Sequence, residues 1–178
     1  MVKTVIVNVV STANLQQKLD LHELEQFKEI LHDTKTYRGR VAYFKIPTME
    51  GKVSIFASGK MISVGTKSEP QARKELKLAA RFLVDKGYAK PIGLSFRTQN
   101  MVITADFRKS LDLEKLSETA RAIYEPEQFP GAIVHYEKPY RTSILVFASG
   151  KVVIAGLKSS TQIEPTMEKL KELIESNQ

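Results

Sequence analysis

Alternating side chains along residues 2–12 predict a β-strand at the start of the chain. Asn8 and Val10 fall on one face of this strand, and Val7 and Val9 fall on the other. Shorter runs of the same kind predict three more strands in the first half of the chain, over residues 41–46, 52–56 and 60–65.

Two segments carry the spacing of apolar residues that is typical of amphipathic helices. The first is predicted to run from Asp20, with Glu23 completing a capping box, to about Leu31. The second is predicted to begin after Ser68 and to end at Gly87. The apolar stripes of these two helices are Leu21, Leu24, Phe27 and Leu31, and Ala72, Leu76, Ala79, Ala80 and Leu83.

The second half of the chain repeats the first. The stretch Ser-Ile-Phe-Ala-Ser-Gly-Lys-Met-Ile at 54–62 returns as Ile-Leu-Val-Phe-Ala-Ser-Gly-Lys-Val-Val at 144–153. Each copy predicts two strands joined by a tight turn at Ser-Gly, because glycine tolerates the positive φ of hairpin turns. A phenylalanine, Phe56 or Phe147, precedes each turn.

The duplication predicts two domains, residues 1–90 and 91–178, with the same order of elements. In the second copy we expect a strand to Thr104, a helix from Asp112 to about Ile123, a loop at 124–131, strands to Gly156 and a last helix from about Glu164.

The predicted sheet has more apolar surface than its helices can cover. Each repeat supplies about five strands but only two helices, which cover one face. The central strands are apolar on both faces, with Val53, Ile55 and Met61 on one and Phe56, Ile62 and Val64 on the other. An exposed apolar face usually marks a binding surface for a partner. The alternative is a homodimer in which two copies bury that face against each other.

Charge and composition narrow the class of protein. The formal net charge is +7, with 15 basic and 9 acidic residues up to residue 89 and 12 basic and 11 acidic residues after it. A basic balance favours a polyanionic partner. The absence of cysteine excludes disulfides and thiol catalysis, and neither a signal-peptide pattern nor a long apolar run occurs. We therefore expect an intracellular protein without a membrane segment.

At these residues the chain resembles the TATA-binding protein family in its archaeal form. The resemblance rests on five stretches of motif residues, at 56–60 with 147–151, 65–68 with 156–159, and 99–102, and above all on Tyr-Glu-Pro-Glu-Gln-Phe-Pro-Gly at 124–131. It implies an α+β fold in which two direct repeats form a saddle-shaped, curved antiparallel sheet of ten strands, with four helices on the convex side and a stirrup loop at each end.

The resemblance also implies a function. Members of the family are general transcription initiation factors that bind the minor groove of A·T-rich promoter DNA, bend it with inserted aromatic side chains, and recruit transcription factor B and, indirectly, RNA polymerase. They need no catalytic residue, metal or cofactor. The protein would act in the cytoplasm, at the nucleoid, if archaeal, and in the nucleus if eukaryotic.

The family's DNA-contacting residues can be carried over position by position. Asn8 and Asn100 match amides that donate to the groove's acceptors, since A·T pairs offer only acceptors there. The floor of the groove-binding face is matched by Asn8, Val10, Ile62, Val64, Asn100, Val102, Leu145, Val153 and Ala155. The wedges that kink the duplex are matched by Phe56, Phe129 and Phe147, with Tyr37 as the candidate fourth.

Two further sets follow from the resemblance. Phosphate contacts are matched by Ser58, Lys60, Lys67, Ser149, Lys151 and Lys158. In the second stirrup, Glu125, Glu127 and Gln128 match the end of the saddle that receives transcription factor B.

Departures from the family pattern keep an alternative open. Tyr37-Arg38-Gly39 stands where the second stirrup has Phe-Pro-Gly, and Val64 and Ala155 stand where the family usually has hydroxyl residues. The alternative is a divergent paralogue with relaxed or altered promoter preference, or a nucleic-acid-binding module that does not recognise a TATA box.

Other functions have less support. The histidines His22, His32 and His135 lack the spacing of a metal site or catalytic triad, so we expect them to be solvated or to face DNA. A sheet that binds RNA would need aromatic residues in its strand centres, which are aliphatic here. A basic ridge on the second helix is either a solvated face or a docking site for an acidic regulator or flanking DNA; it consists of Arg73, Lys74, Lys77 and Arg81.

Overall fold

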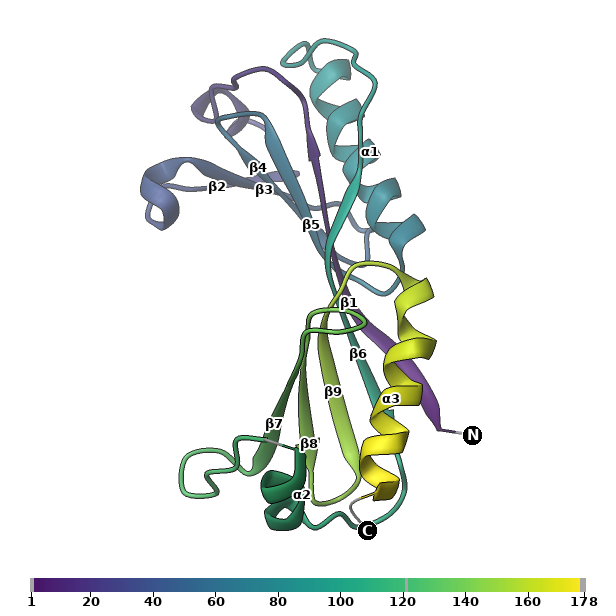
Figure 1. The fold of residues 1–178 in the computed structure, drawn as a ribbon. Coiled ribbons are helices and arrows are strands. Elements are labelled where there is room, and N and C mark those ends of the chain that lie inside the picture. Colours follow the sequence, from purple (N-terminus) through teal and green to yellow (C-terminus); the bar gives the residue numbers. More distant parts are fainter. Residues whose placement is uncertain (1, 121, 177–178) are drawn as a thin grey trace. The chain divides into compact units, whose positions relative to one another are not determined.

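The computed structural model describes residues 2–120 and 122–176. Its elements are labelled in Figure 1, where η denotes a 3-10 helix. In the first repeat they are β1 (Lys3–Asn14), η1 (His22–Leu24), β2 (Ile30–Asp33), η2 (Thr36–Gly39), β3 (Val41–Phe44), β4 (Lys52–Phe56), β5 (Lys60–Thr66) and α1 (Glu69–Asp85). In the second they are β6 (Arg97–Asp106), α2 (Leu113–Ala120), β7 (Gly131–Tyr136), β8 (Thr142–Phe147), β9 (Lys151–Leu157), η3 (Ser160–Gln162) and α3 (Ile163–Ser176).

The predicted fold class is confirmed, with two repeats that build an antiparallel sheet. Strands of the described chain hydrogen-bond in the order β2-β3-β4-β5-β1-β6-β9-β8-β7. The chain divides into two compact units, Asn8–Gln99, and Met1–Val7 together with Asn100–Gln178. None of the described helices combines the length and the apolar character that a membrane span requires.

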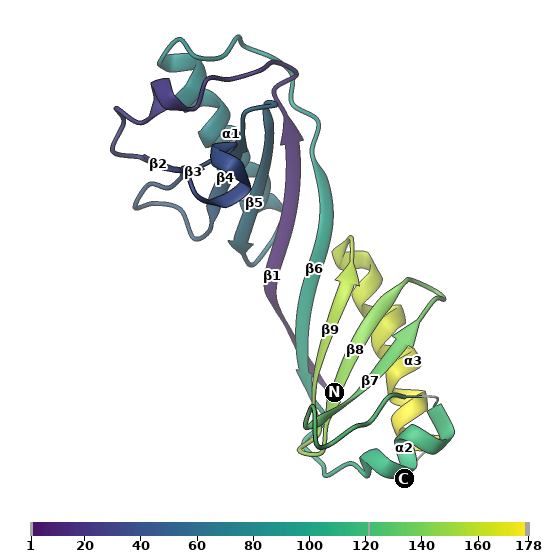
Figure 2. The ribbon, with the colours of Figure 1, turned by 90° about the vertical axis from the view of Figure 1, so that its left-hand side faces the viewer.

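In the unit Asn8–Gln99, α1 covers one face of the sheet (Figures 1 and 2). The helix begins where predicted, because the Gln71 N–H donates to Ser68 Oγ at 3.3 Å. It ends at Asp85, shortly before Gly87, which has a φ of +82°. Every member of its predicted apolar stripe is buried against the strands, namely Ala72, Leu76, Ala79, Ala80 and Leu83.

The strands of this unit have the two faces that their sequence predicts. On the helix side Val53, Ile55 and Met61 are fully buried. The register places Ile55 opposite Met61 and Ser54 opposite Ile62, so the pairing keeps each set on one face. On the opposite face the side chains are only half-buried, as at Ile62.

The other unit is built on the same plan. Its helix α2 begins at the predicted cap, where Asp112 Oδ1 accepts a hydrogen bond from the Lys115 N–H at 3.0 Å. Its helix α3 buries the predicted residues Met167, Leu170 and Ile174. The core strands contribute Ile103, Ile144 and Ile154, which are fully buried.

Tyr136 lies on β7 beneath α3. The Lys169 ammonium sits 4.3 Å from the centroid of its ring and donates to the Lys138 carbonyl at 2.5 Å. Burial, and secondly the Glu172 carboxylate, raise the pKa of Tyr136 to about 12. Its hydroxyl has no hydrogen-bond partner among the described residues.

The predicted helix from Asp20 to Leu31 is wrong. Only η1 forms there; Asp20 Oδ1 accepts from the N–H of His22 at 3.0 Å, two residues on, and so closes a local turn. The chain then extends into β2, which pairs with β3, and Leu31 is 69% exposed. The described chain therefore has three α-helices instead of the expected four.

The second repeat differs from the first at the corresponding strand. Its helix α2 ends at Ala120, earlier than the expected Ile123. Ile123 instead exchanges two backbone hydrogen bonds with Ile133, at 2.9 and 2.8 Å, as an isolated bridge. The tenth strand of the expected sheet is thus a single residue pair, and nine strands form in the described chain.

Candidate nucleic-acid interface

In each unit the sheet face opposite the helices carries the residues predicted as a groove floor. All of them are half-buried, whereas their neighbours along each strand are buried under the helices. The set consists of Asn8, Val10, Ile62 and Val64 in one unit and Asn100, Val102, Leu145, Val153 and Ala155 in the other. Alternation along the strands predicted this placement. Each unit therefore presents a mostly aliphatic surface with one asparagine.

The two asparagines have a fixed amide orientation. The Gly65 N–H donates to Asn8 Oδ1 at 2.9 Å, and the Gly156 N–H donates to Asn100 Oδ1 at 2.8 Å. A backbone N–H can only donate, so the atom that faces it must be the amide oxygen. Both N–H donors on each Nδ2 remain available, since neither has a partner within the described part of the chain.

A β-bulge creates this arrangement in both repeats. The pairing of β1 with β5 shifts register between Val9 and Ser11, and that of β6 with β9 shifts between Met101 and Val102. At each shift the strand opposite carries the glycine that donates to the asparagine, with a φ of +96° or +106°. The bulge turns the glycine N–H out of the strand ladder and towards the side chain.

The four wedge candidates come together as two pairs. The rings of Tyr37 and Phe56 lie edge-to-face with their centroids 5.8 Å apart and an interplanar angle of 76°. Phe129 and Phe147 lie at the same centroid distance with an angle of 60°. In each repeat a loop aromatic thus meets the aromatic that precedes the hairpin tip, and Tyr37 occupies the place that Phe129 has in the other unit.

The two loops reach this geometry by different means. In the second, the Gln128 and Phe129 N–H groups both donate to the Glu125 carbonyl at 2.9 Å, which closes a tight turn. In the first, Tyr37 and Arg38 adopt left-handed backbone conformations, with φ of 50° and 57°. Tyr37 is 64% exposed.

Each unit has a hollow beside its hairpin tip, lined by equivalent residues. The first hollow, of about 470 Å³, is bounded by Phe56, Ser58 and Lys60. The second hollow, of about 670 Å³, is bounded by Phe147, Ser149 and Lys151. Both have a floor of sheet residues, Ile62 in the first and Val153 in the second.

The structure adds cations that sequence reasoning missed. Arg97 lines the first hollow, and Lys3 and Arg108 line the second. The duplication was the available signal, since Arg108 aligns with Gln16 and both have a positive φ. The predicted phosphate contacts Lys67 and Lys158 are exposed but lie outside these hollows, beyond the bulge glycines.

The predicted partner contacts are accessible. Glu125, Glu127 and Gln128 are all exposed on the turn that carries Phe129. The loop of the first repeat carries the opposite charge, with Lys35, Arg38 and Arg40 exposed. The two loops therefore differ in sign as well as in backbone conformation.

The expectation that all histidines are solvated is wrong for His32. Its side chain is 1% exposed, because β2 and the loop before β3 enclose it. His32 and His22 both hydrogen-bond to Glu25, and these bonds, with His32 the larger contributor, lower the pKa of that carboxyl. The remaining histidine, His135, is exposed and bonds to Ser143 at 3.0 Å.

Two repeats, each with one helix-covered and one open aliphatic sheet face, define a duplicated α+β protein with a large binding surface. The family model described as transcription factor TFIID, or TATA-binding protein, matches residues 3–85 and again residues 95–177. The chain belongs to this family.

Individual relatives agree with this assignment. The TATA-box-binding protein of Cenarchaeum symbiosum is 38% identical over 159 residues, which is 89% of this chain and 86% of the relative. That of Pyrobaculum aerophilum is 33% identical over 167 residues, or 93% and 82%. The structure of Methanococcus jannaschii TBP matches with a TM-score of 0.86 and 30% identity, covering 98% of this chain and 99% of that one.

Proposed function

We propose that this protein is a transcription initiation factor that binds the minor groove of A·T-rich promoter DNA through the open sheet face of its two repeats. It bends the duplex with its paired aromatic residues and recruits transcription factor B, and through it RNA polymerase. Membership of the TATA-binding protein family and relatives that carry the name TATA-box-binding protein support this function.

The observation that carries the proposal is the orientation of Asn8 and Asn100. The minor groove at an A·T pair offers only acceptors, adenine N3 and thymine O2. Each asparagine offers only donors, because a glycine N–H already occupies its oxygen. The match requires no rotation of the amide on binding, so the interaction is preorganised.

The aliphatic floor adds selectivity against G·C pairs. Guanine places an amino group in the minor groove, which an apolar surface can neither accommodate nor hydrogen-bond. Val64 and Ala155 remove two hydroxyls from the floor, so polar readout is concentrated on the two asparagines. We expect recognition to depend on them more than in relatives with hydroxyl residues at those positions.

The aromatic pairs supply the wedges. Inserting an apolar side chain between base steps costs a few kcal/mol per step and is offset by wider contact with the bent duplex. The pairing of Tyr37 with Phe56 supports four wedges, two for each repeat. Serine and lysine side chains around the two hollows are placed to contact phosphates beside the kinks.

Bending gives a direct test of the wedges. A duplex labelled at both ends should show a shorter end-to-end distance by fluorescence transfer when the protein is bound. Replacing Phe129 and Phe147 together by alanine should weaken binding more than Lys151→Ala does, since a lysine contributes only one phosphate contact. An unchanged end-to-end distance at saturation would contradict the wedge assignment.

Exchanging amide for carboxylate tests the groove readout. In Asn8→Asp and Asn100→Asp each carboxylate can still accept the glycine N–H, so the fold should be preserved. Each loses two donors, worth about 0.5–1.5 kcal/mol apiece, and gains a negative charge facing the DNA. The double variant should therefore bind an A·T-rich duplex at least about a hundredfold more weakly, since 1.4 kcal/mol is tenfold.

Lys171→Gln on α3 is a control for charge, because it removes one positive charge on the helix-covered side. It should bind the duplex nearly as well as the wild type. A G·C-rich duplex and a single-stranded RNA complete the comparison and should bind weakly to all variants. Wild-type affinity for A·T-rich DNA in the folded double variant would refute the proposed readout.

A further inference from the structure

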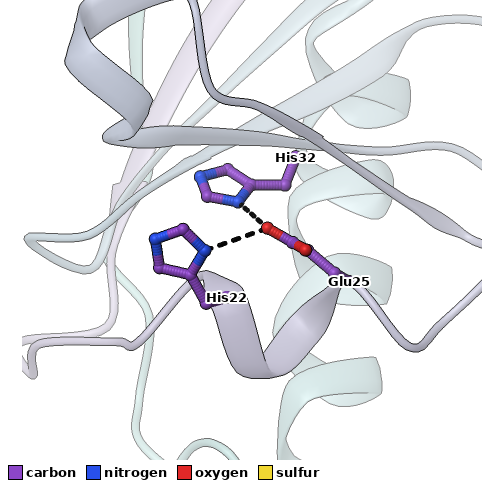
Figure 3. Close-up of side chains that lie close together, drawn as sticks. All are labelled: His22, Glu25 and His32. Atoms are coloured by element: carbon purple, nitrogen blue, oxygen red, sulfur yellow. Dashed lines mark hydrogen bonds and ion pairs between the residues drawn. The ribbon is translucent and has the colours of Figure 1, made fainter.

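The first repeat gathers two histidines and a glutamate at one point (Figure 3). His22 belongs to η1, Glu25 follows that turn, and His32 belongs to β2. Glu25 Oε1 lies 3.0 Å from His22 Nδ1 and 2.5 Å from His32 Nδ1. The three candidate ligand atoms all lie within 4.8 Å of one another.

The hydrogen bonding of His32 determines what can lie between it and Glu25. His32 Nε2 is 2.7 Å from the Gly39 carbonyl oxygen. A carbonyl only accepts, so Nε2 carries a hydrogen, and the neutral ring then has its lone pair at Nδ1. That lone pair faces a carboxylate oxygen at 2.5 Å. Two such groups repel unless a cation, either a proton or a metal ion, lies between them.

We infer that His22 Nδ1, Glu25 Oε1 and His32 Nδ1 form a binding site for a divalent transition-metal ion, with zinc the ion that fits best. Two imidazoles and a carboxylate are zinc ligands, and a three-residue set leaves one position for water. The bond from His32 Nε2–H to the Gly39 carbonyl is the outer hydrogen bond that orients a metal-ligating histidine.

The dimensions suit the ion after a small adjustment. Zinc–nitrogen and zinc–oxygen bonds of about 2.0–2.1 Å in a tetrahedron place the ligand atoms about 3.3 Å apart. The two observed separations from Glu25 Oε1, 3.0 and 2.5 Å, must therefore open slightly. The side chain of His22 is 74% exposed and can move, while that of His32 is enclosed and stays fixed.

The site would join separate parts of the first repeat. Glu25 and His22 belong to the turn after β1, His32 belongs to β2, and Gly39 ends the loop that carries Tyr37. That loop lacks the two prolines that restrict residues 124–131. Metal binding is thus expected to stiffen the first loop, and it is independent of whether the chain binds DNA.

The test is metal binding by the untagged, metal-free protein. Zinc binding is measured by calorimetry, and Co²⁺ serves as a probe whose visible absorption reports tetrahedral coordination. We expect one equivalent of zinc per chain, an intense cobalt spectrum, and a higher unfolding temperature with zinc. His22→Ala and Glu25→Gln should each weaken binding at least about tenfold, in line with losses of 10- to 100-fold even for outer partners.

The exposed His135 provides a matched control. It is the one histidine outside the cluster, so His135→Ala should bind zinc like the wild type. His22 is exposed, and its replacement should leave the fold intact, which circular dichroism checks. Absence of zinc binding by the wild type, or equal binding by wild type and His22→Ala, would overturn the proposal and leave a shared proton between His32 and Glu25.

Discussion

Replacing Gly59 by alanine should destabilise the first repeat strongly. Gly59 forms the tip of the hairpin between β4 and β5 and has a φ of +84°. A Cβ there would lie 2.0 Å from the Gln17 carbonyl oxygen. The segment after β1 is fastened across this tip, since the Leu15 N–H donates to the Gly59 carbonyl at 2.9 Å. Because the atom in the way is backbone, no side-chain rotation can relieve the clash.

The cost can be estimated from two contributions. A non-glycine residue in the left-handed region costs about 1–2 kcal/mol. Forcing an additional methyl group into packed structure costs about 1–3 kcal/mol, occasionally more. Gly59→Ala should therefore lose about 2–5 kcal/mol of unfolding free energy. Gly150, with its Cβ position 2.3 Å from the Lys109 carbonyl oxygen, should behave in the same way.

Gly87 supplies the control that separates these contributions. Its φ of +82° matches that of Gly59, but a Cβ there would meet nothing within 4 Å. Gly87→Ala should lose only the conformational part, about 1–2 kcal/mol. Urea unfolding followed by circular dichroism measures both variants. Equal losses for Gly59→Ala and Gly87→Ala would refute the reasoning, because only the steric contribution distinguishes them.

Three further predictions concern other parts of the molecule. The pKa of Tyr136 is raised to about 12 in the fold, above the ordinary value of 10.0, so its contribution to stability is complete below pH 10 and lost as the pH rises to about 12; Tyr136→Phe should remove that part of the decline in urea midpoint. Glu125→Arg with Glu127→Arg should leave DNA binding intact or stronger yet abolish the complex with transcription factor B in gel shifts, and ternary assembly at wild-type affinity would contradict this. Charge reversal at Lys74 and Lys77 on α1 should lower transcription in a reconstituted assay, and unaltered transcription and DNA binding would show that this ridge is only solvated.

Local signals predicted the repeated parts of the fold well. The hairpins follow from alternation and a glycine turn, and α1 follows from Ser68, which caps it as expected. Asp20 and Asp112 show the limit of such signals, since both have the capping pattern but only Asp112 begins an α-helix. The apolar spacing after Asp20 also fits a series of turns, and pairing of β2 with the distant β3 decides between them.

The candidate site was predictable where it depends on alternation and unpredictable where it depends on distant partners. The open face could be assigned from the strands alone. The bond between Gly65 and Asn8 joins residues 57 positions apart and depends on a bulge that no local pattern indicates. The cluster around Glu25 was missed because the predicted helix would have directed His22 and His32 elsewhere.

The hydrogen bond from Gly65 to Asn8 ties the evolution of these two positions together. A side chain at 65 is strained at a φ of +96° and would displace the N–H that holds the amide. An asparagine released in this way could present its oxygen to the groove acceptors and would repel them. Descendants of this chain should therefore keep or replace the two residues jointly, and Gly156 with Asn100 should drift as a second, independent pair.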